Sequence, residues 1–215
     1  SARLPGGVTY PGGVSRSVNL IYCHPYPDRS RAGRRLLDAV RDVPGVKVRS
    51  LYELYPDFDI DVAAEQEALV QADLLVWQGP FYWYGVPSLL SLWFEKVLAQ
   101  GWAYGEGARA LRGKSALWVT TTGAPEPAFQ AGAMHGHRFE EFIPAVSQTA
   151  RFCGMNWIDP PVVVHGAHRI SSGDLREAAR AYRARLEMLV GVSGGSGGAD
   201  GISGARERGE ELVDG

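Results

Sequence analysis

Short apolar segments alternate with amphipathic helical segments through the middle of this chain. Residues 18–23 (VNLIYC) form an apolar run typical of a strand buried on both faces, and residues 31–43 place apolar side chains at helical spacing. The same order recurs. Further strands are predicted at residues 45–52, 73–80, 114–123 and 161–167, and further helices at residues 61–72, 86–100, 139–154 and 172–189. Five strand–helix units in this order predict an α/β protein with a parallel sheet.

The regular alternation predicts a three-layer sandwich in which helices cover both faces of a five-stranded parallel sheet. Strand order 2-1-3-4-5, the flavodoxin-like arrangement, agrees with the segment order, and a Rossmann-type sheet is the alternative. Residues 18–190 are predicted to form this single domain. Residues 1–17 are rich in Gly, Pro and Ser, and residues 191–215 are rich in Gly and charge, so we expect a flexible extension and a disordered tail.

The composition excludes several classes of protein. Of the 215 residues, 45% are hydrophobic and 21% are charged, as in an ordinary soluble globule, and a net charge of -2 lacks the basic excess of a nucleic-acid binder. No apolar run approaches the roughly 20 residues that span a bilayer, and the N-terminal residues lack the apolar core of a secretory signal. We therefore expect a cytoplasmic protein without membrane insertion. Cys23 and Cys153 lack metal-ligand spacing and are predicted to be buried thiols, so no metal site is expected.

The first strand is followed by a loop suited to an anion. Residues 24–33 (HPYPDRSRAG) end at a predicted helix N-terminus, where free N–H groups and the helix dipole attract negative charge. Ser30 adds a hydroxyl, and Arg29 or Arg31 adds a cation. The loop has neither G-x-G-x-x-G nor G-x-x-x-x-G-K-[ST], so it favours the phosphate of flavin mononucleotide (FMN) or the pyrophosphate of FAD. The alternative for Ser30 is a plain helix cap.

A second loop, after the third strand, carries four consecutive aromatic residues: Phe81, Tyr82, Trp83 and Tyr84. At the carboxyl end of a parallel strand, aromatic rings and loop amides are suited to hold a planar heterocycle. The alternative is packing at a dimer interface or against the next helix. A third loop, after the fourth strand, supplies Thr121, Thr122 and Gly123, a weak signal in which glycine allows close approach of the backbone.

Four segments together resemble a known family: HPYPDRSRA at residues 24–32, the long stretch at 54–105, LWVTTTG at 117–123 and FCGMNW at 152–157. They are similar to flavodoxin-like NAD(P)H:quinone oxidoreductases, and more to the flavin-bearing ancillary subunits of glutathione-gated potassium efflux systems than to animal DT-diaphorases. The likeness covers residues 18–189.

The resemblance implies a flavin site built from all three loops. Its phosphate end would be held by His24, Ser30, Arg31, Ala32 and Gly33, its ring would lie along Phe81, Tyr82, Trp83 and Tyr84, and its other edge would be closed by Thr121, Thr122, Gly123 and Ala124. This chain departs from the family pattern at two places. Gly33 stands where Asn is usual, and the GAPEP segment at residues 123–127 replaces a more glycine-rich one.

The resemblance also implies ping-pong hydride transfer, from NAD(P)H through the flavin to a quinone, with two electrons moving together. The expected cofactor is FMN, with FAD as the alternative. His135 is the candidate catalytic residue, for stabilising the reduced flavin or delivering a proton. His137 is an alternative to it, and a plain surface role for His135 is another. DT-diaphorases carry a catalytic Tyr where this chain has Phe129.

The resemblance implies a homodimer with each flavin site at the subunit boundary, and a potassium efflux transporter as a further partner. With such a partner, the alternative to a free cytoplasmic protein is a peripheral position at the inner face of the membrane. Two other functions stay open. One is a regulatory flavin-binding subunit of such a transporter. The other is a flavodoxin-like electron carrier, which is less favoured because carriers of that kind are strongly acidic and this chain has a net charge of -2.

Overall fold

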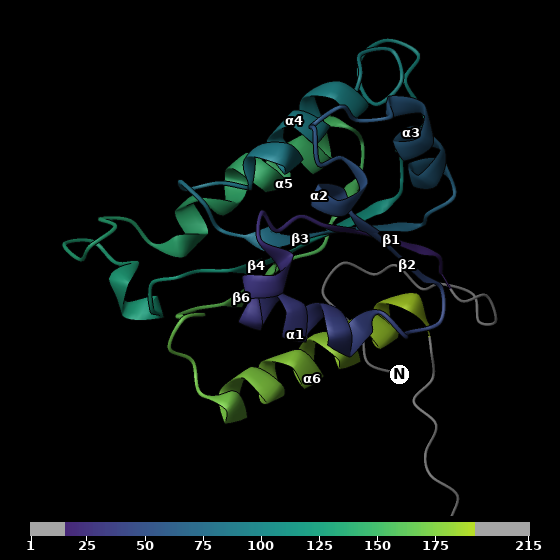
Figure 1. Ribbon diagram of the computed structural model, residues 1–215. Helices are drawn as coiled ribbons and strands as arrows, with labels where there is room; N and C mark the ends of the chain where they lie inside the picture. The colour runs from purple at the N-terminus through teal and green to yellow at the C-terminus, as the bar shows by residue number, and fades with distance from the viewer. Residues whose placement is uncertain (1–15, 192–215) are drawn as a thin grey trace, which may run out of the picture.

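The computed structural model describes residues 16–191, in which a parallel sheet lies between two layers of helices (Figure 1). The predicted extension and tail, apart from residues 16, 17 and 191, lie outside the described residues. The strands are β1 (Val18–Tyr22), β2 (Val46–Ser50), β3 (Leu74–Pro80), β4 (Ser115–Thr121), β5 (Asn156–Trp157) and β6 (Val162–Val164). Their order is β2-β1-β3-β4-β5, with β6 also paired to β4, and all pairs are parallel. The predicted flavodoxin-like sheet is confirmed.

The last part of the sheet differs from the prediction, because two short strands replace one. β5 pairs with the start of β4, and β6 pairs with its end. Between them the chain contains Pro160 and Pro161, which have no N–H to donate to a sheet ladder and so interrupt the strand. The segment predicted as a strand at residues 161–167 is thus extended only over Val162–Val164.

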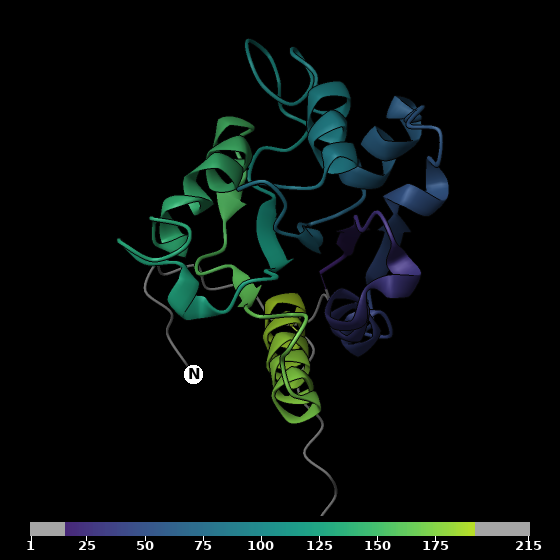
Figure 2. The ribbon, with the colours of Figure 1, turned by 60° about the vertical axis from the view of Figure 1, so that its left-hand side comes forward.

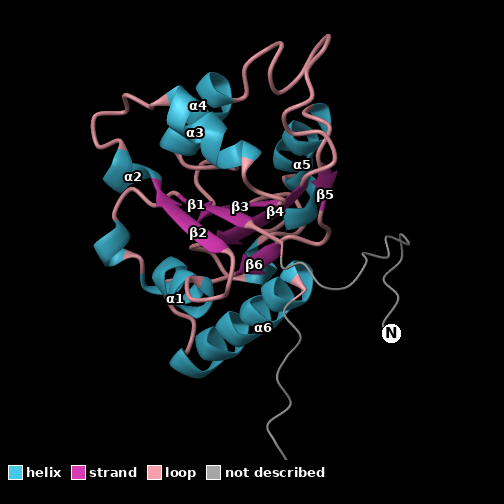
Figure 3. Ribbon diagram, turned by 90° about the vertical axis from the view of Figure 1, so that its right-hand side faces the viewer, coloured by secondary structure: helices cyan, strands magenta, loops and turns pink. Residues whose placement is uncertain are grey.

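Helices cover both faces of the sheet (Figures 2 and 3). The helices are α1 (Arg31–Val40), α2 (Leu51–Leu54), α3 (Val62–Val70), α4 (Ser88–Val97), α5 (Ile143–Phe152) and α6 (Ser172–Val190), with 3-10 turns at Pro27–Arg29, Glu126–Ala128 and Phe139–Glu141. α1 and α6 pack on one face, and α2 to α5 lie on the other (Figure 3). Each face has its own apolar core.

The central strands show why the apolar runs predicted this sheet. Every residue of β3 and β4 is buried, and alternate side chains enter the two cores. Leu74 and Val76 contact the core beneath α1 and α6, whereas Leu75 and Trp77 contact the core beneath α3 and α4. Burying one such side chain stabilises the fold by roughly 1.5–3 kcal/mol. Both cysteines are buried, as predicted.

Two local features were not predicted. The strand expected at residues 45–52 ends at Ser50, and the short helix α2 begins at Leu51, whose side chain is fully buried in the core. The N-cap of α6 is Ser171, one residue before the predicted start of this helix. The Ser171 Oγ accepts a hydrogen bond from the Asp174 amide at 3.1 Å.

Candidate functional site

A cavity of about 170 Å³ opens at the carboxyl ends of β1, β3 and β4, where the three loops meet. Its lining residues are His24, Arg29, Ser30, Arg31, Ala32, Gly33, Pro80, Phe81, Tyr82, Thr121, Gly123, Ala167 and His168. Residues far apart in the sequence converge here because β1 and β4 both flank β3 in the sheet. Nine of the fourteen predicted site residues line this cavity. It lies where parallel sheets bind ligands, beyond the carboxyl ends of the strands.

The N-terminus of α1 forms one wall of the cavity. The first main-chain hydrogen bond of this helix joins the Arg34 amide to the Ser30 carbonyl at 3.0 Å. The amides of Arg31, Ala32 and Gly33 come before it and therefore have no acceptor within the helix. Ser30 is only 6% exposed, and its hydroxyl makes no capping hydrogen bond. Free amides, a buried hydroxyl and the positive end of the helix dipole are the chemistry that binds a phosphate.

Gly33 gives the Ser30 hydroxyl its space. A Cβ atom on Gly33 would lie 2.6 Å from the Ser30 Oγ, closer than van der Waals contact allows. Because the glycine carries no side chain, the hydroxyl lies over the first turn of α1. The glycine at this position, a departure from the family pattern, therefore fits a cradle for a phosphate.

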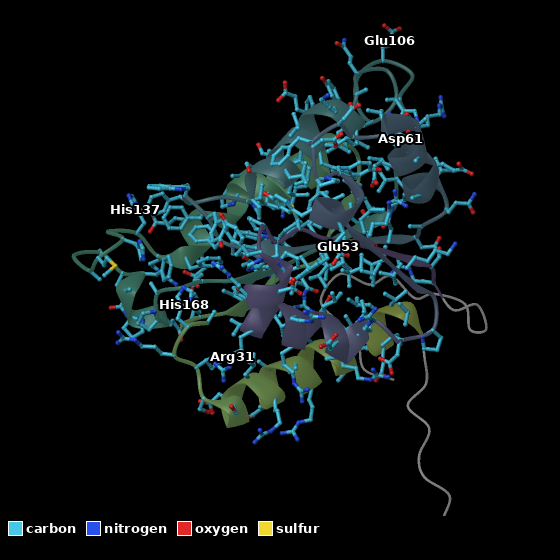
Figure 4. The ribbon with its side chains drawn as sticks, viewed as in Figure 1. Arg31, Glu53, Asp61, Glu106, His137 and His168 are labelled. Atoms are coloured by element: carbon cyan, nitrogen blue, oxygen red, sulfur yellow. The ribbon has the colours of Figure 1, made fainter. Side chains whose placement is uncertain are left out.

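Two arginines bring positive charge to the cavity. Arg29 and Arg31 both line it. Arg31 also donates hydrogen bonds to the Ile170 carbonyl at 2.9 Å and the Ser172 hydroxyl at 3.2 Å, so it connects the first loop to the start of α6. Figure 4 shows Arg31 and His168 on the same side of the molecule, and both line the cavity.

His24 lies in the cavity wall as a neutral imidazole. Its Nδ1 accepts a hydrogen bond from the Tyr26 amide at 3.1 Å, so that nitrogen carries no proton. Its ring lies between Tyr22 and Tyr82, with ring centroids 6.4 and 6.5 Å away. Burial lowers the pKa of His24. His24 therefore contributes a polar edge near neutral pH, without a positive charge.

A pH dependence of stability follows from His24 and from His165. Burial lowers the pKa of both imidazoles in the folded protein, whereas the unfolded chain keeps a value of about 6.5. Below about pH 6.5 the unfolded chain binds more protons, so the free energy of unfolding falls as the pH decreases toward 5. We expect the urea midpoint to decrease over this range, and less so in His24→Gln and His165→Gln. A slope that neither substitution reduces would contradict this origin.

The aromatic loop makes a tight turn that separates its four rings. Tyr82 and Gly85 exchange main-chain hydrogen bonds of 3.2 and 3.0 Å, and the two residues between them have positive φ angles, 48° at Trp83 and 64° at Tyr84. Positive φ strains an aromatic residue. Phe81 and Tyr82 therefore line the cavity, while Trp83 points outward and is 94% exposed.

Tyr84 and His135 lie together beside the cavity without lining it. The Tyr84 ring stacks on Phe142, with centroids 5.4 Å apart, and meets the His135 ring edge-on at 5.8 Å. The His135 ring also stacks on Phe129 at 4.2 Å. Both ring nitrogens of His135 are buried and have no hydrogen-bond partner among the described residues. This imidazole therefore has two unused polar atoms next to the aromatic loop.

The third loop contributes less than the sequence predicts. Thr121 and Gly123 line the cavity, but the Thr122 hydroxyl bonds the Ala124 carbonyl at 2.7 Å and His165 Nδ1 at 3.0 Å. The Thr122 side chain is therefore engaged within the loops, and Ala124 is not part of the lining. His165 thereby acquires a structural partner.

Sequence reasoning did not assign Pro80, Ala167 and His168 to the site. His168 lies against Gly123, because a Cβ on that glycine would be 3.0 Å from His168 Nε2. The sequence clue that could have assigned His168 to the site is its position in the chain. It follows β6, whose carboxyl end lies beside that of β4, so residues after β6 reach the same edge of the sheet.

The residues of the cavity suit a phosphorylated, planar ligand. The α1 amides and Ser30 meet an anion, and Phe81 and Tyr82 supply aromatic surface next to it. Gly123 exposes its backbone at the opposite side. An FMN molecule has both of these parts, so the residues present fit this cofactor.

Known proteins share this fold and much of this sequence. Residues 16–186 match the family model described as a flavodoxin-like fold. The chain is 50% identical over 169 residues to the glutathione-regulated potassium-efflux system ancillary protein KefF of Enterobacter sp. (strain 638), covering 79% of this chain and 94% of that protein.

Two solved structures are also similar. General stress protein 14 of Treponema denticola, solved in complex with FMN, is 35% identical, with a TM-score of 0.74 over 80% of this chain and 99% of that one. An NADPH-quinone reductase from P. pentosaceus is 28% identical, with a TM-score of 0.71 over 79% of this chain and 97% of that one. The family match and the observed sheet order show that the chain belongs to the flavodoxin-like fold family.

Proposed function

We propose that this protein is an FMN-dependent NAD(P)H:quinone oxidoreductase. The observation that carries the proposal is the cavity in which the free amides of α1 and the buried Ser30 hydroxyl lie beside Phe81, Tyr82 and Gly123. The FMN bound by the Treponema denticola relative and the activity named for the P. pentosaceus relative support it. FMN is favoured over FAD because the first loop offers one helix N-terminus and no glycine-rich pyrophosphate fingerprint.

In this proposal the amides of Arg31, Ala32 and Gly33 bind the phosphate together with Ser30, and Arg29 balances its charge. Phe81 and Tyr82 exclude water from one edge of the ring, and the main chain of the third loop faces the other. When bound, FMN supplies reversible acceptance and donation of a hydride. The protein therefore has to bind, orient and shield the reactants.

NAD(P)H and the quinone are proposed to bind in turn at the same open face, which gives ping-pong kinetics. His135 is the residue proposed to hold or deliver the proton that accompanies hydride transfer. Its two buried nitrogens have no partner among the described residues, and its ring contacts Tyr84 of the aromatic loop. An imidazole is suited to hold or move a proton near neutral pH.

The test is an absorption spectrum of the purified protein, release and identification of the chromophore, and steady-state NADPH oxidation with menadione. We expect bound FMN with flavin absorbance, and turnover that gives parallel lines in double-reciprocal plots. His135→Gln is expected to lower kcat by roughly 10²-fold, the usual contribution of a general acid–base group, while FMN stays bound. A protein that remains colourless after incubation with FMN would overturn the proposal.

A homodimer is proposed as the working form, with the site near the subunit boundary. In the aromatic loop, Trp83 is 94% exposed and Tyr84 is 50% exposed. Met134, next to His135 in the chain, is 81% exposed. Large apolar side chains gathered beside a site are typical of a covered surface. Sedimentation at micromolar concentration is expected to give a dimer, and Trp83→Glu is expected to shift it toward monomer. Met188→Glu, at an exposed position of α6, is the control.

A second candidate is the role named for the Enterobacter relative, an ancillary subunit of a potassium-efflux system. The 50% identity over 94% of that protein favours it. Within residues 16–191, no helix has the length and apolar character needed to cross a membrane. The candidate predicts that the protein co-purifies with an efflux transporter. Bound FMN without quinone turnover, together with such co-purification, would favour this role over the enzyme.

A further inference from the structure

A second cavity, of about 440 Å³, lies between α3 and the strands β1 and β2, and it shares no lining residue with the site described above. Its lining residues are Ser17, Val18, Asn19, Lys47, Val48, Arg49, Ala64, Glu67, Ala68, Gln71 and Ala72. The cavity includes the start of β1, so it lies toward the opposite edge of the sheet from the flavin site.

Asn19 is the unusual residue of this cavity. It is 3% exposed, and both its carboxamide Oδ1 and Nδ2 are buried without a hydrogen-bond partner among the described residues. Buried polar groups in folded proteins almost always have a partner. The Asn19 side chain points to the same face of the sheet as those of Ile21 and Cys23, which enter the core beneath α3 and α4. Its carboxamide therefore faces the layer that contains α3.

The wall formed by α3 leaves room opposite Asn19. Ala64, Ala68 and Ala72 recur every four residues, so three small side chains follow one face of the helix and the turn after it. The larger side chains of that helix, Glu65 and Leu69, enter the core instead. The result is a slot with a wall of small alanine side chains on the α3 side and a buried carboxamide, unpartnered among the described residues, on the β1 side.

The charges around the slot favour a neutral ligand. Arg49 is engaged, since its guanidinium bonds the Glu65 carboxylate at 2.8 and 2.6 Å. Lys47 and Glu67 are both exposed at the rim and carry opposite charges. A ligand with a formal charge would be attracted by one of these two side chains and repelled by the other.

We propose that this cavity is a binding site for a neutral purine base or nucleoside. A carboxamide offers one acceptor and one pair of donors, so it is complementary to a ligand edge with an adjacent donor and acceptor. Asparagine forms such a paired contact with N6 and N7 of adenine. The alanine face of α3 leaves space for a flat ring beside this carboxamide.

The experiment measures adenosine binding to the full chain by calorimetry, with FMN saturating so that the first cavity is filled. Asn19→Leu is expected to weaken binding about 10- to 100-fold, which is the worth of a paired contact to a base. Ala68→Leu fills the slot from a half-buried helix position and is expected to weaken binding while keeping the fold intact. N6,N6-dimethyladenosine, which lacks the N6 donor, is expected to bind weakly to the wild type and no more weakly to Asn19→Leu.

The same variants separate this site from the flavin site. Asn19→Leu and Ala68→Leu are expected to bind FMN as the wild type does, and Ser30→Asp, which blocks the phosphate cradle, is expected to bind adenosine as the wild type does. No adenosine binding at millimolar concentration would overturn the inference. Equal binding by the wild type, Asn19→Leu and Ala68→Leu would also overturn it. In either case the FMN measurements would stand on their own.

Discussion

Ser30→Asp is expected to lower the affinity of this protein for FMN about 1,000-fold. The Ser30 side chain lies at the N-terminus of α1, 6% exposed and in the wall of the cavity that we assign to the phosphate. A carboxylate there would repel a bound phosphate, because two like unit charges about 4 Å apart repel by about 4 kcal/mol at an effective dielectric constant of 20. Each 1.4 kcal/mol is a factor of ten in affinity. FMN titration followed by flavin fluorescence measures the change.

Ser30→Asn is the matched control. Asn and Asp have the same size, and both are good N-cap residues, so α1 is expected to keep its start in either variant. Asn lacks the negative charge, so its FMN affinity is expected to exceed that of the Asp variant by most of the 1,000-fold. Riboflavin has no phosphate, and the two variants are expected to bind it equally. Equal loss of FMN affinity in both would mean that shape and not charge explains the effect.

The sheet was predictable because its central strands are apolar on both faces. β3 and β4 are buried along their whole length, so no alternation of polar and apolar residues obscured them. The end of β2 was not predictable in the same way. Leu51 and Tyr52 continue the apolar pattern of the strand, yet Leu51 begins α2 because the core lies on that side. The sequence pattern identifies a buried residue, while tertiary packing decides its backbone conformation.

Within the site, the position of each loop was predictable but the direction of its side chains was not. Phe81 and Tyr82 line the cavity, whereas Trp83 and Tyr84 turn away because both have positive φ angles. No residue type in this turn signals that conformation, since glycine and asparagine are the usual ones there. A resemblance also assigns roles by position, so it could not tell that the Thr122 hydroxyl bonds His165.

One of the most consequential groups for stability gave no signal in the sequence at all. Glu65 lies in a helix and would be read as a surface charge, yet its side chain is fully buried. Its carboxylate accepts hydrogen bonds from Arg49 at 2.6 and 2.8 Å, from the Tyr55 hydroxyl at 2.7 Å and from the Trp93 indole at 3.0 Å. Burial, with Glu65 nearby, raises the pKa of Tyr55 to about 12, so the phenol stays a donor.

Arg49→Met is therefore expected to reduce the free energy of unfolding by about 3–5 kcal/mol, because it leaves a buried carboxylate without its cation. Urea unfolding at pH 7 measures the loss. Arg138→Met removes an arginine from an ion pair whose side chains are 71% and 66% exposed, and it is expected to cost no more than about 1 kcal/mol.

The double variant Arg49→Met with Glu65→Gln separates the charge from the packing. The neutral amide keeps the shape of Glu65. Its oxygen accepts the hydrogen bond from the Trp93 indole and its NH2 group donates to the Tyr55 hydroxyl oxygen, while the uncompensated charge is gone. We expect the double variant to be more stable than Arg49→Met alone, a sign of strong coupling between the two positions. If the two losses simply added, the arginine would stabilise the fold through its contacts and not by neutralising a buried carboxylate.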